Sequence, residues 1–415
     1  MKKEILTTKL DRGKVIVKSA FNVGMKKAKR PFVSQGKKEQ IDNEIGDIIF
    51  DNISLLKGTV IKLSQALALH NIIPQNMQKT LEKSYNNINP LSKALVIKIL
   101  KNEFKNDYKE VFDEFELEAF ASASLGQVHR AKKDDKRLAV KIQYPSIDKT
   151  IQNDLKLVKG FSKFKGILKL IIEEVEEKLY EEIDYLKEAQ HTIEAFRLFD
   201  GENILVPKVN KKLTTKHILT TSFIDGLDLN SWIKSKPNKK DKTKIANLIY
   251  DMFLDSIFIH KSLQADPNPA NYIITPDTKL ALIDFGCVKR FDEDFIKSLK
   301  NFMHSYILND KKTVAKIYKE VGFIKDEKEM SEKTYKNMIL PFNAWMIEPY
   351  KNDKYLFTQE YLDRGLGFAE MFEKAQFKIV KDFLFYDRTQ HGLFSLFAKM
   401  EVPINMTKAK NEIYN

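Results

Sequence analysis

Two short segments constrain this chain more than any other feature of its 415 residues. In the first, Asp266 lies five positions before Asn271, and the second is the triplet Asp284-Phe285-Gly286, which follows after a short stretch of chain. Two carboxylates and one amide in this order are the groups that hold divalent cations and orient an acceptor in phosphoryl transfer. We therefore expect Asp266 to act as general base or to orient an acceptor, and Asn271 and Asp284 to bind Mg²⁺.

The local setting of these groups supports the same interpretation. Residues 280–283 are apolar and predict a buried strand, whose end can hold the carboxylate of Asp284 rigidly. Pro267 and Pro269 stiffen the segment between the first Asp and the Asn. Each segment alone is also typical of an ordinary turn or hairpin end, so the prediction rests on their combination at this spacing.

A lysine lies inside an apolar run at residues 138–142, which predict a strand. This run resembles the kinase strand whose lysine holds the α and β phosphates of ATP, so we expect Lys141 to bind ATP. A surface-facing lysine on an alternating strand is the alternative, because an unpaired lysine is costly to bury. A helical region is predicted from about 151 to 199. Among its acids we favour Glu188 as the partner of the lysine, with Glu182 as the alternative, and we expect Asp184 and Glu188 to share a helix face.

The segment expected to cover the phosphates departs from an ordinary kinase. Where a Gly-rich loop is usual, residues 121–128 read Ala-Ser-Ala-Ser-Leu-Gly-Gln-Val. Alanine approaches phosphate less closely than glycine and rarely adopts positive φ, so this loop should be stiffer. The four residues that we expect to contact the nucleotide are Ala121, Ser122, Ala123 and Ser124.

Taken together, the chain resembles the UbiB/AarF (ADCK) family of atypical kinase-like proteins, from about residue 50 to about residue 300. Four motifs of the family occur in the expected order: the Lys-x-Gly-Gln signature at 62–65, the Ala-rich loop at 121–128, the Glu-x-Asp motif at 182–184 and the His-x-Asp-Pro-His-Pro-Gly-Asn segment at 264–271.

The chain also differs from the family pattern at four positions. Ser64 stands where glycine is usual in the Lys-x-Gly-Gln signature, Gln264 and Asn268 replace the two histidines, and Ala270 replaces a glycine. The expected metal ligands and the strand lysine are retained. These replacements therefore bear on turnover and regulation more than on nucleotide binding.

The resemblance implies an α+β, two-lobed protein-kinase-like fold, with a small mixed lobe, a large helical lobe and an N-terminal helical extension. The predicted boundaries are a basic N-terminal arm at 1–40, the helical extension at 41–112, the N-lobe at 113–225 and the C-lobe at 226–415. In this family the extension caps the nucleotide cleft. The residues implied to form this regulatory cap are Lys62, Gln65, Glu182 and Asp184, with Lys62 pairing with one of the two acids.

The resemblance also implies function. Family members bind ATP with Mg²⁺ and act as ATPases or unorthodox kinases in ubiquinone or other isoprenoid-lipid metabolism at membranes. The alternative is a pseudokinase scaffold or lipid-presenting protein that binds nucleotide without phosphotransfer. A helix is predicted to start at Asp292 with no Ala-Pro-Glu motif before it, so we expect lipid-like small molecules rather than a protein as substrate.

The charge of the chain is uneven. Its net charge is +13, and residues 1–40 hold ten Lys and two Arg against three acids, while the remaining chain is nearly balanced. Apolar residues are interspersed in this arm, so it could lie on an anionic membrane surface. A solvated tail is the alternative, and nucleic acid is not expected as a partner because no recognition motif is present.

Other features limit the compartment. Cys287 is the single cysteine, so no internal disulfide can form and a reducing compartment is expected. The chain has no run of about 18 consecutive apolar residues, so a spanning helix is not expected. Its N-terminus has no uninterrupted apolar run, so a signal peptide is not expected either. We therefore expect a cytoplasmic protein, and peripheral attachment to the inner membrane is compatible with the basic arm.

Overall fold

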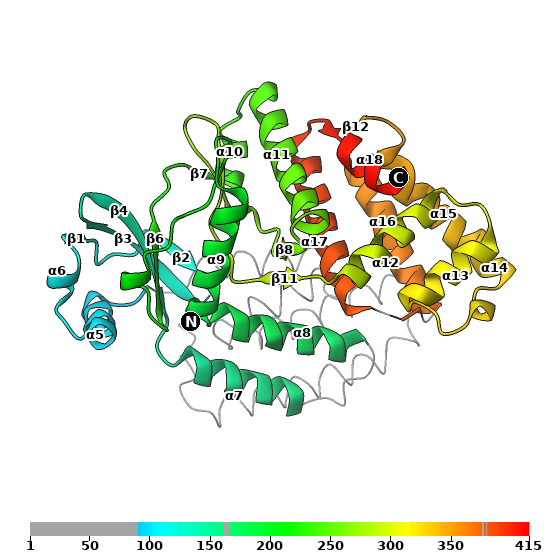
Figure 1. Ribbon diagram of the computed structural model, residues 1–415. Helices are drawn as coiled ribbons and strands as arrows, with labels where there is room; N and C mark the ends of the chain where they lie inside the picture. The colour runs from blue at the N-terminus through cyan, green and yellow to red at the C-terminus, as the bar shows by residue number, and fades with distance from the viewer. Residues whose placement is uncertain (1–89, 124, 161–166, 376, 379, 415) are drawn as a thin grey trace, which may run out of the picture. The chain divides into compact units, whose positions relative to one another are not determined.

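The computed structural model describes residues 90–414, except 124, 161–166, 376 and 379. These residues form two compact units, and each is considered by itself (Figure 1). The first contains the described residues up to Gln190 together with Val209–Phe223, and the second contains His191–Lys208 and the described residues from Ile224 onward. The boundaries predicted from the sequence stay a prediction, and the arm at 1–40 lies outside the described residues.

The first unit combines a mixed set of helices with one sheet. Its helices are α5 (Lys93–Phe104), α6 (Tyr108–Val111), α7 (Ile147–Gly160), α8 (Ile167–Glu182) and α9 (Tyr185–Phe199), whose end belongs to the second unit. Its strands are β1 (Glu114–Phe115), β2 (Ala121–Ala123), β3 (Gly126–Lys133), β4 (Lys136–Gln143) and β6 (Ile218–Ser222). The sheet is antiparallel in the order β1-β3-β4-β6, with β2 paired to β3.

Alternation along β4 gives this sheet two different faces. Val140 and Ile142 are fully buried and pack with Val96 and Leu100 of α5, which lies beside the sheet in Figure 1. Because successive side chains of a strand point to opposite faces, Lys141 lies on the other face. The strand predicted around residues 138–142 is thus confirmed, and its register decides where the lysine points.

The helical region predicted over 151–199 is interrupted, and this corrects one expectation. Between α8 and α9 the chain leaves the helix at Ile183 and Asp184. The Asp184 carboxylate accepts a hydrogen bond from the Lys187 backbone N–H at 3.0 Å, which satisfies an orphan donor at the start of α9. Asp184 therefore caps the helix that carries Glu188, and the two do not share a helix face as predicted.

The second unit is mostly helical. Its helices are α10 (Leu229–Lys234), α11 (Lys239–Phe258), α12 (Glu293–His304), α13 (Lys311–Val321), α14 (Glu332–Thr334), α15 (Leu340–Ile347), α16 (Gln359–Lys374), α17 (Lys381–Met400) and α18 (Thr407–Tyr414). Its short strands are β5 (Ile204–Leu205), β7 (Leu227–Asp228), β8 (Ser262–Gln264), β9 (Tyr272–Ile274), β10 (Leu280–Leu282), β11 (Val288–Arg290), β12 (Lys354–Tyr355) and β13 (Ile404–Asn405).

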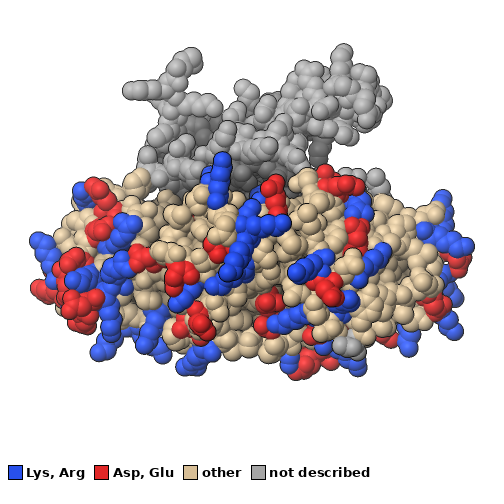
Figure 2. Space-filling model, turned by 90° about the horizontal axis from the view of Figure 1, so that it is seen from above, with Lys and Arg blue, Asp and Glu red and all other residues tan. Residues whose placement is uncertain are grey.

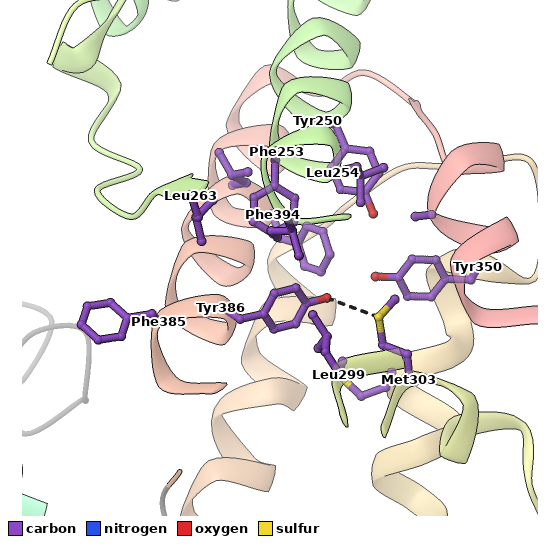
Figure 3. Packing of buried hydrophobic residues seen from close by; sticks show 14 of the residues in the cluster. Tyr250, Phe253, Leu254, Leu263, Leu299, Met303, Tyr350, Phe385, Tyr386 and Phe394 are labelled. Carbon is purple, nitrogen blue, oxygen red and sulfur yellow. Dashed lines mark hydrogen bonds between the residues drawn. The ribbon is translucent and has the colours of Figure 1, made fainter. Parts of the chain in front are cut away.

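Aromatic residues dominate the core of this unit. Figure 3 shows Tyr250 and Phe253 of α11 packed with Tyr386 and Phe394 of α17. The Tyr250 and Phe394 rings are 6.4 Å apart, and those of Phe253 and Tyr386 are 5.9 Å apart. Aromatic pairs at this separation bury large apolar areas and add specific ring contacts. The two helices therefore form a rigid base for the short strands that follow α11.

Those strands form two small sheets that carry the polar segments of interest. The order β5-β10-β9-β7 makes one sheet, and β8 pairs with β11 in the other. β9 and β10 form a hairpin in which Leu282 is opposite Tyr272. Across the part of the chain that the structure describes, no helix combines the length and apolarity needed to cross a bilayer.

Candidate functional site

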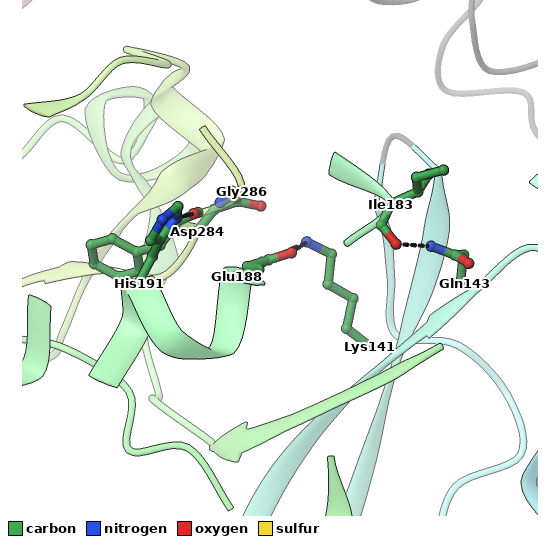
Figure 4. A network of polar contacts seen from close by, with 8 residues as sticks. Lys141, Gln143, Ile183, Glu188, His191, Asp284 and Gly286 are labelled. Atoms are coloured by element: carbon green, nitrogen blue, oxygen red, sulfur yellow. Dashed lines mark hydrogen bonds and ion pairs between the residues drawn. The ribbon is translucent and has the colours of Figure 1, made fainter. Parts of the chain in front are cut away.

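In the first unit, Lys141 and Glu188 form a largely buried ion pair. The Lys141 Nζ lies 2.8 Å from Oε1 and 3.0 Å from Oε2 of Glu188, and the two side chains point toward each other from β4 and α9 in Figure 4. Their side chains are 14% and 2% exposed. A charge pair this buried is held in one geometry, so the pairing predicted from the sequence is present as a fixed feature of the unit.

Close packing at the start of α9 sets the position of this pair. Tyr185 is 1% exposed, and its ring centroid lies 5.1 Å from the Lys141 Nζ. A Cβ added at Gly126 would lie 2.8 Å from the Tyr185 hydroxyl and 2.4 Å from the Ile142 carbonyl oxygen, so only glycine fits there. The Gln143 amide also donates to the Ile183 carbonyl at 2.8 Å, which ties the end of β4 to the start of α9 (Figure 4).

On the side of Lys141 that faces β3 and β2, its neighbours on the same sheet face have small side chains, whereas its partner on β6 is the buried Leu219. Lys141 is opposite Val128, and Val128 is opposite Ala121 on the next strand. Ala139 lies two residues before the lysine and therefore on the same face. Directly paired residues share a face, so Val128 and Ala121 lie on the same face as the ammonium-bearing Lys141.

In the second unit, Asp266 and Asn271 lie in the segment that follows β8. Asn271 is 8% exposed and ends the short 3₁₀ helix Pro269–Asn271, and its Nδ2 donates to the Asp266 carbonyl oxygen at 3.1 Å. The Asn268 Oδ1 accepts from the Ala270 N–H at 3.0 Å and so caps this helix. Burial raises the pKa of Tyr272 far above its ordinary value, and the charge of nearby Asp266 raises it further.

Asp284 follows β10 and lies next to Asn271 along the hairpin. The Ile283 N–H donates to the Asn271 carbonyl oxygen at 3.0 Å, which continues the β9–β10 ladder by one step. The Asp284 Oδ1 accepts from the Gly286 N–H at 2.9 Å, which fixes the carboxylate at the turn (Figure 4). The His191 ring nitrogen Nδ1 lies 3.2 Å from the Phe285 carbonyl oxygen and supports the same turn.

The chemistry of these side chains fits a hard divalent cation. Mg²⁺ is usually held by one or two carboxylates together with substrate phosphates, and Asp284 and Asn271 offer one carboxylate and one amide oxygen. Nowhere in the described residues do three or more His, Cys, Asp and Glu side chains gather as a metal site. A cation at this hairpin would therefore take its other ligands from a bound phosphate or from water.

Two residues of α17 contact the Asp266 segment, and the sequence analysis did not identify them. The Arg388 Nη2 donates to the Ala265 carbonyl oxygen at 2.5 Å, and its side chain is buried. A Cβ added at Gly392 would lie 2.4 Å from the Pro267 Cγ. The two positions are four apart and share a helix face. Nothing in the sequence distinguishes Arg388, because the same helix also carries charged residues such as Asp382, Asp387 and Lys399.

Replacing Gly392 with Ala should disturb this contact. The added methyl group must displace the proline ring beside Asp266, so we expect a loss of about 1–3 kcal/mol in the free energy of unfolding, as for overpacked cores. Any catalytic function of Asp266 should weaken as well. Urea unfolding of the purified variant measures the first effect, and an activity assay of the same sample measures the second.

Gly367 provides a matched control for this substitution. It also lies in a helix, α16, but nothing lies within 4 Å of the Cβ that an alanine would add. Gly367→Ala should therefore stabilise the protein by up to about 1 kcal/mol through helix propensity alone. The packing argument fails if both variants shift stability in the same direction.

The structure describes only some of the remaining residues that the sequence predicted for the site. Ala121 and Ser122 are exposed on β2 and Ala123 is partly exposed, whereas Ser124, Lys62 and Gln65 lie outside the described residues. Glu182 ends α8, and the ion pair with Lys141 is made by Glu188. The ATP-binding, metal-binding and cap roles of all these residues stay predictions.

Comparison with protein families identifies the kind of domain. The profile of the ABC1 atypical kinase-like domain matches residues 83–318. A solved structure, the complex of Rv3197 with erythromycin from Mycobacterium tuberculosis, matches with a TM-score of 0.64 and 20% identity, covering 91% of this chain and 98% of that chain. At this identity the likeness shows the fold alone, and the two-lobed α+β kinase-like fold predicted from the sequence is confirmed.

Curated relatives have kinase names. The probable serine/threonine-protein kinase abkA of Dictyostelium discoideum is 23% identical over 393 residues, covering 88% of this chain and 70% of the relative. The mitochondrial atypical kinase COQ8 of Saccharomyces cerevisiae is 27% identical over 386 residues, covering 89% and 76%. The mitochondrial atypical kinase coq-8 of Caenorhabditis elegans is 27% identical over 312 residues, covering 71% of this chain but 40% of the relative.

Proposed function

Because the chain belongs to the UbiB/AarF family of ABC1 atypical kinase-like proteins, we propose that it binds Mg²⁺-ATP and hydrolyses it or transfers its γ-phosphoryl group. The acceptor would be a small or lipid-like molecule, in support of ubiquinone or other isoprenoid-lipid metabolism at a membrane surface. The observation that carries the proposal is the buried Lys141–Glu188 ion pair, because kinases use such a pair to orient the lysine toward the phosphates.

The sheet face around the lysine supports nucleotide binding. Ala121, Val128 and Ala139 share the sheet face of Lys141 and have short side chains, so a flat purine would lie against them with the ammonium of Lys141 beside it for the phosphates. Burial against an apolar platform would hold the base, while the ion pair would hold the charged end. The stiff Ala-rich hairpin of β2 and β3 would then cover the phosphates in place of a glycine-rich loop.

The second unit would supply the catalytic groups. Asp266 would accept a proton from the attacking hydroxyl or water, or orient it, and Asn271 and Asp284 would hold the Mg²⁺ that neutralises charge on the phosphates. The attacking oxygen forms a bond to the γ-phosphorus as the bond to the β–γ bridging oxygen breaks, and ADP leaves. Asn271 holds the backbone of Asp266 through its amide N–H, so both residues would keep their relative positions during this step.

Ligand-dependent melting tests this proposal directly. Mg²⁺-ATP at one hundred times its Kd should stabilise the protein by about 2.7 kcal/mol, which raises Tm by several degrees. Asp284→Asn should abolish most of that rise because it removes the charged metal ligand. A control with ATP in excess EDTA should resemble the variant. If Asp284→Asn melts with an unchanged Mg²⁺-ATP shift, the metal assignment is wrong.

A nucleotide-binding protein without phosphotransfer is the second candidate. It is favoured by the altered catalytic segment, in which Asn268 is committed to capping the short helix at Pro269 and a glutamine occupies position 264. Phosphate release measured with acidic vesicles separates the two candidates. Release that exceeds the background and disappears in Asp266→Asn supports catalysis, whereas a Mg²⁺-ATP melting shift without any release supports the scaffold.

A further inference from the structure

A second concentration of positive charge lies in the second unit, at the end of α10 and the start of α11. Residues 234–244 contain six lysines and one aspartate, whereas the chain outside this segment and residues 1–40 is close to electroneutral. The lysines are Lys234, Lys236, Lys239, Lys240, Lys242 and Lys244, and all but the partly buried Lys242 are exposed. We call these six residues the lysine surface.

The lysine surface is not neutralised by acids of the described chain. Lys244 donates to the Thr278 carbonyl oxygen at 3.0 Å. None of Lys234, Lys236, Lys239 and Lys240 forms an ion pair with a carboxylate in the part of the chain that the structure describes. Asp241, the one acid of the segment, is hydrogen-bonded to Asn238 instead. The positive charge is therefore available to an external partner.

The first turn of α11 holds more positive than negative charge, because Asp241 is its one acid. Asn238 caps the helix, and Lys239 and Lys240 are its first two residues. The backbone N–H groups already make a helix N-terminus positive, so acids are preferred there and lysines are disfavoured. Sequences usually break such local rules where function requires it. An anionic partner would relieve this repulsion.

The lysines are also close enough to act together. The rise from Lys239 to Lys244 along α11 is roughly 8 Å, which is less than the Debye length of about 10 Å at 0.1 M salt. Figure 2, seen from above the view of Figure 1, shows Lys and Arg side chains gathered near the middle of the face. A broad anionic surface can contact such a cluster at once, whereas a single phosphate contacts only part of it.

We propose that the lysine surface docks the protein onto a bilayer that contains anionic phospholipids. Polybasic segments are attracted to such surfaces without a structured pocket. A membrane fits better than nucleic acid, because residues 234–244 contain no arginine and no aromatic side chain for stacking on bases. The exposed Leu227, two residues before α10, offers an apolar contact. This docking deepens the membrane part of the proposed function and rests on it.

Vesicle co-sedimentation of the full chain tests the proposal. The test variant replaces Lys234, Lys236, Lys239 and Lys240 with Gln. The control variant replaces Lys325, Lys328, Lys333 and Lys336 with Gln, and removes the same total charge from an exposed segment that also holds four acids. On phosphatidylcholine vesicles containing phosphatidylglycerol, the test variant should bind at least about tenfold more weakly than the wild type, and the control less than about twofold.

Three further measurements decide the interpretation. Binding of the wild type should fall steeply with added salt, and binding to pure phosphatidylcholine should be weak. Equal losses in the two variants, or a loss of duplex DNA binding with unchanged vesicle binding, would overturn the proposal. The vesicle assay contains no nucleotide, so its failure leaves the Mg²⁺-ATP melting shift intact, and a missing melting shift leaves the vesicle result intact.

Discussion

Replacing Asp266 with Asn is expected to lower the rate of phosphate release from ATP by roughly 10²- to 10⁴-fold, the usual contribution of a general base. The substitution is nearly isosteric and removes the one group proposed to accept the proton of the attacking oxygen. The hydrogen bond from Asn271 goes to the backbone carbonyl of residue 266, so it does not depend on the carboxylate. The segment should keep its shape while losing its chemistry.

Steady-state kinetics of phosphate release, with acidic vesicles present, measure this effect. The loss should lie in kcat, while the Mg²⁺-ATP melting shift remains close to that of the wild type. Asp277→Asn is the matched control, because Asp277 is an exposed carboxylate of the same unit that pairs with Lys279. A rate that falls equally in both variants, or a melting shift lost with the rate, would remove Asp266 from the proposed role.

The sequence was sufficient where local chemistry decides the structure. Lys141 was placed on a strand by the apolar residues around it, and β4 has that position with the lysine on the less buried face. The helix expected to start at Asp292 begins with its carboxylate accepting the Phe295 N–H at 2.7 Å. In both cases one residue and its immediate neighbours carry the information, so no distant contact was needed.

Contacts between distant residues could not be predicted in this way. Arg388 is more than one hundred residues from Ala265 in the chain, and nothing near either residue indicates that they meet. Hydrophobic periodicity alone also suggested one helical region from 151 to 199. The region is instead interrupted at Asp184, because a side chain that can hydrogen-bond the backbone competes with the helix and favours a cap at the start of α9. The lysines of residues 234–244 were missed for another reason: the charge was summed over the whole chain after residue 40, where this local excess is offset by acids elsewhere.

The Lys141–Glu188 pair should show the second large effect, this time on stability. Glu188→Leu removes the carboxylate that lies 2.8 Å from the Lys141 ammonium in a site where both side chains are largely buried. Breaking a buried ion pair from one side typically lowers the free energy of unfolding by about 3–5 kcal/mol. Lys141→Met should have a similar effect because it leaves the 2% exposed carboxylate without this lysine.

The double variant Lys141→Met/Glu188→Leu distinguishes a structural from a functional pair. Replacing both charges with apolar side chains of similar volume avoids the uncompensated charge, so the double variant should be more stable than either single variant. Urea unfolding of all four proteins gives the coupling energy, and the Mg²⁺-ATP melting shift should be lost whenever Lys141 is absent. If the double variant regains stability and still melts with the wild-type Mg²⁺-ATP shift, the ion pair holds the fold together and another group binds the phosphates.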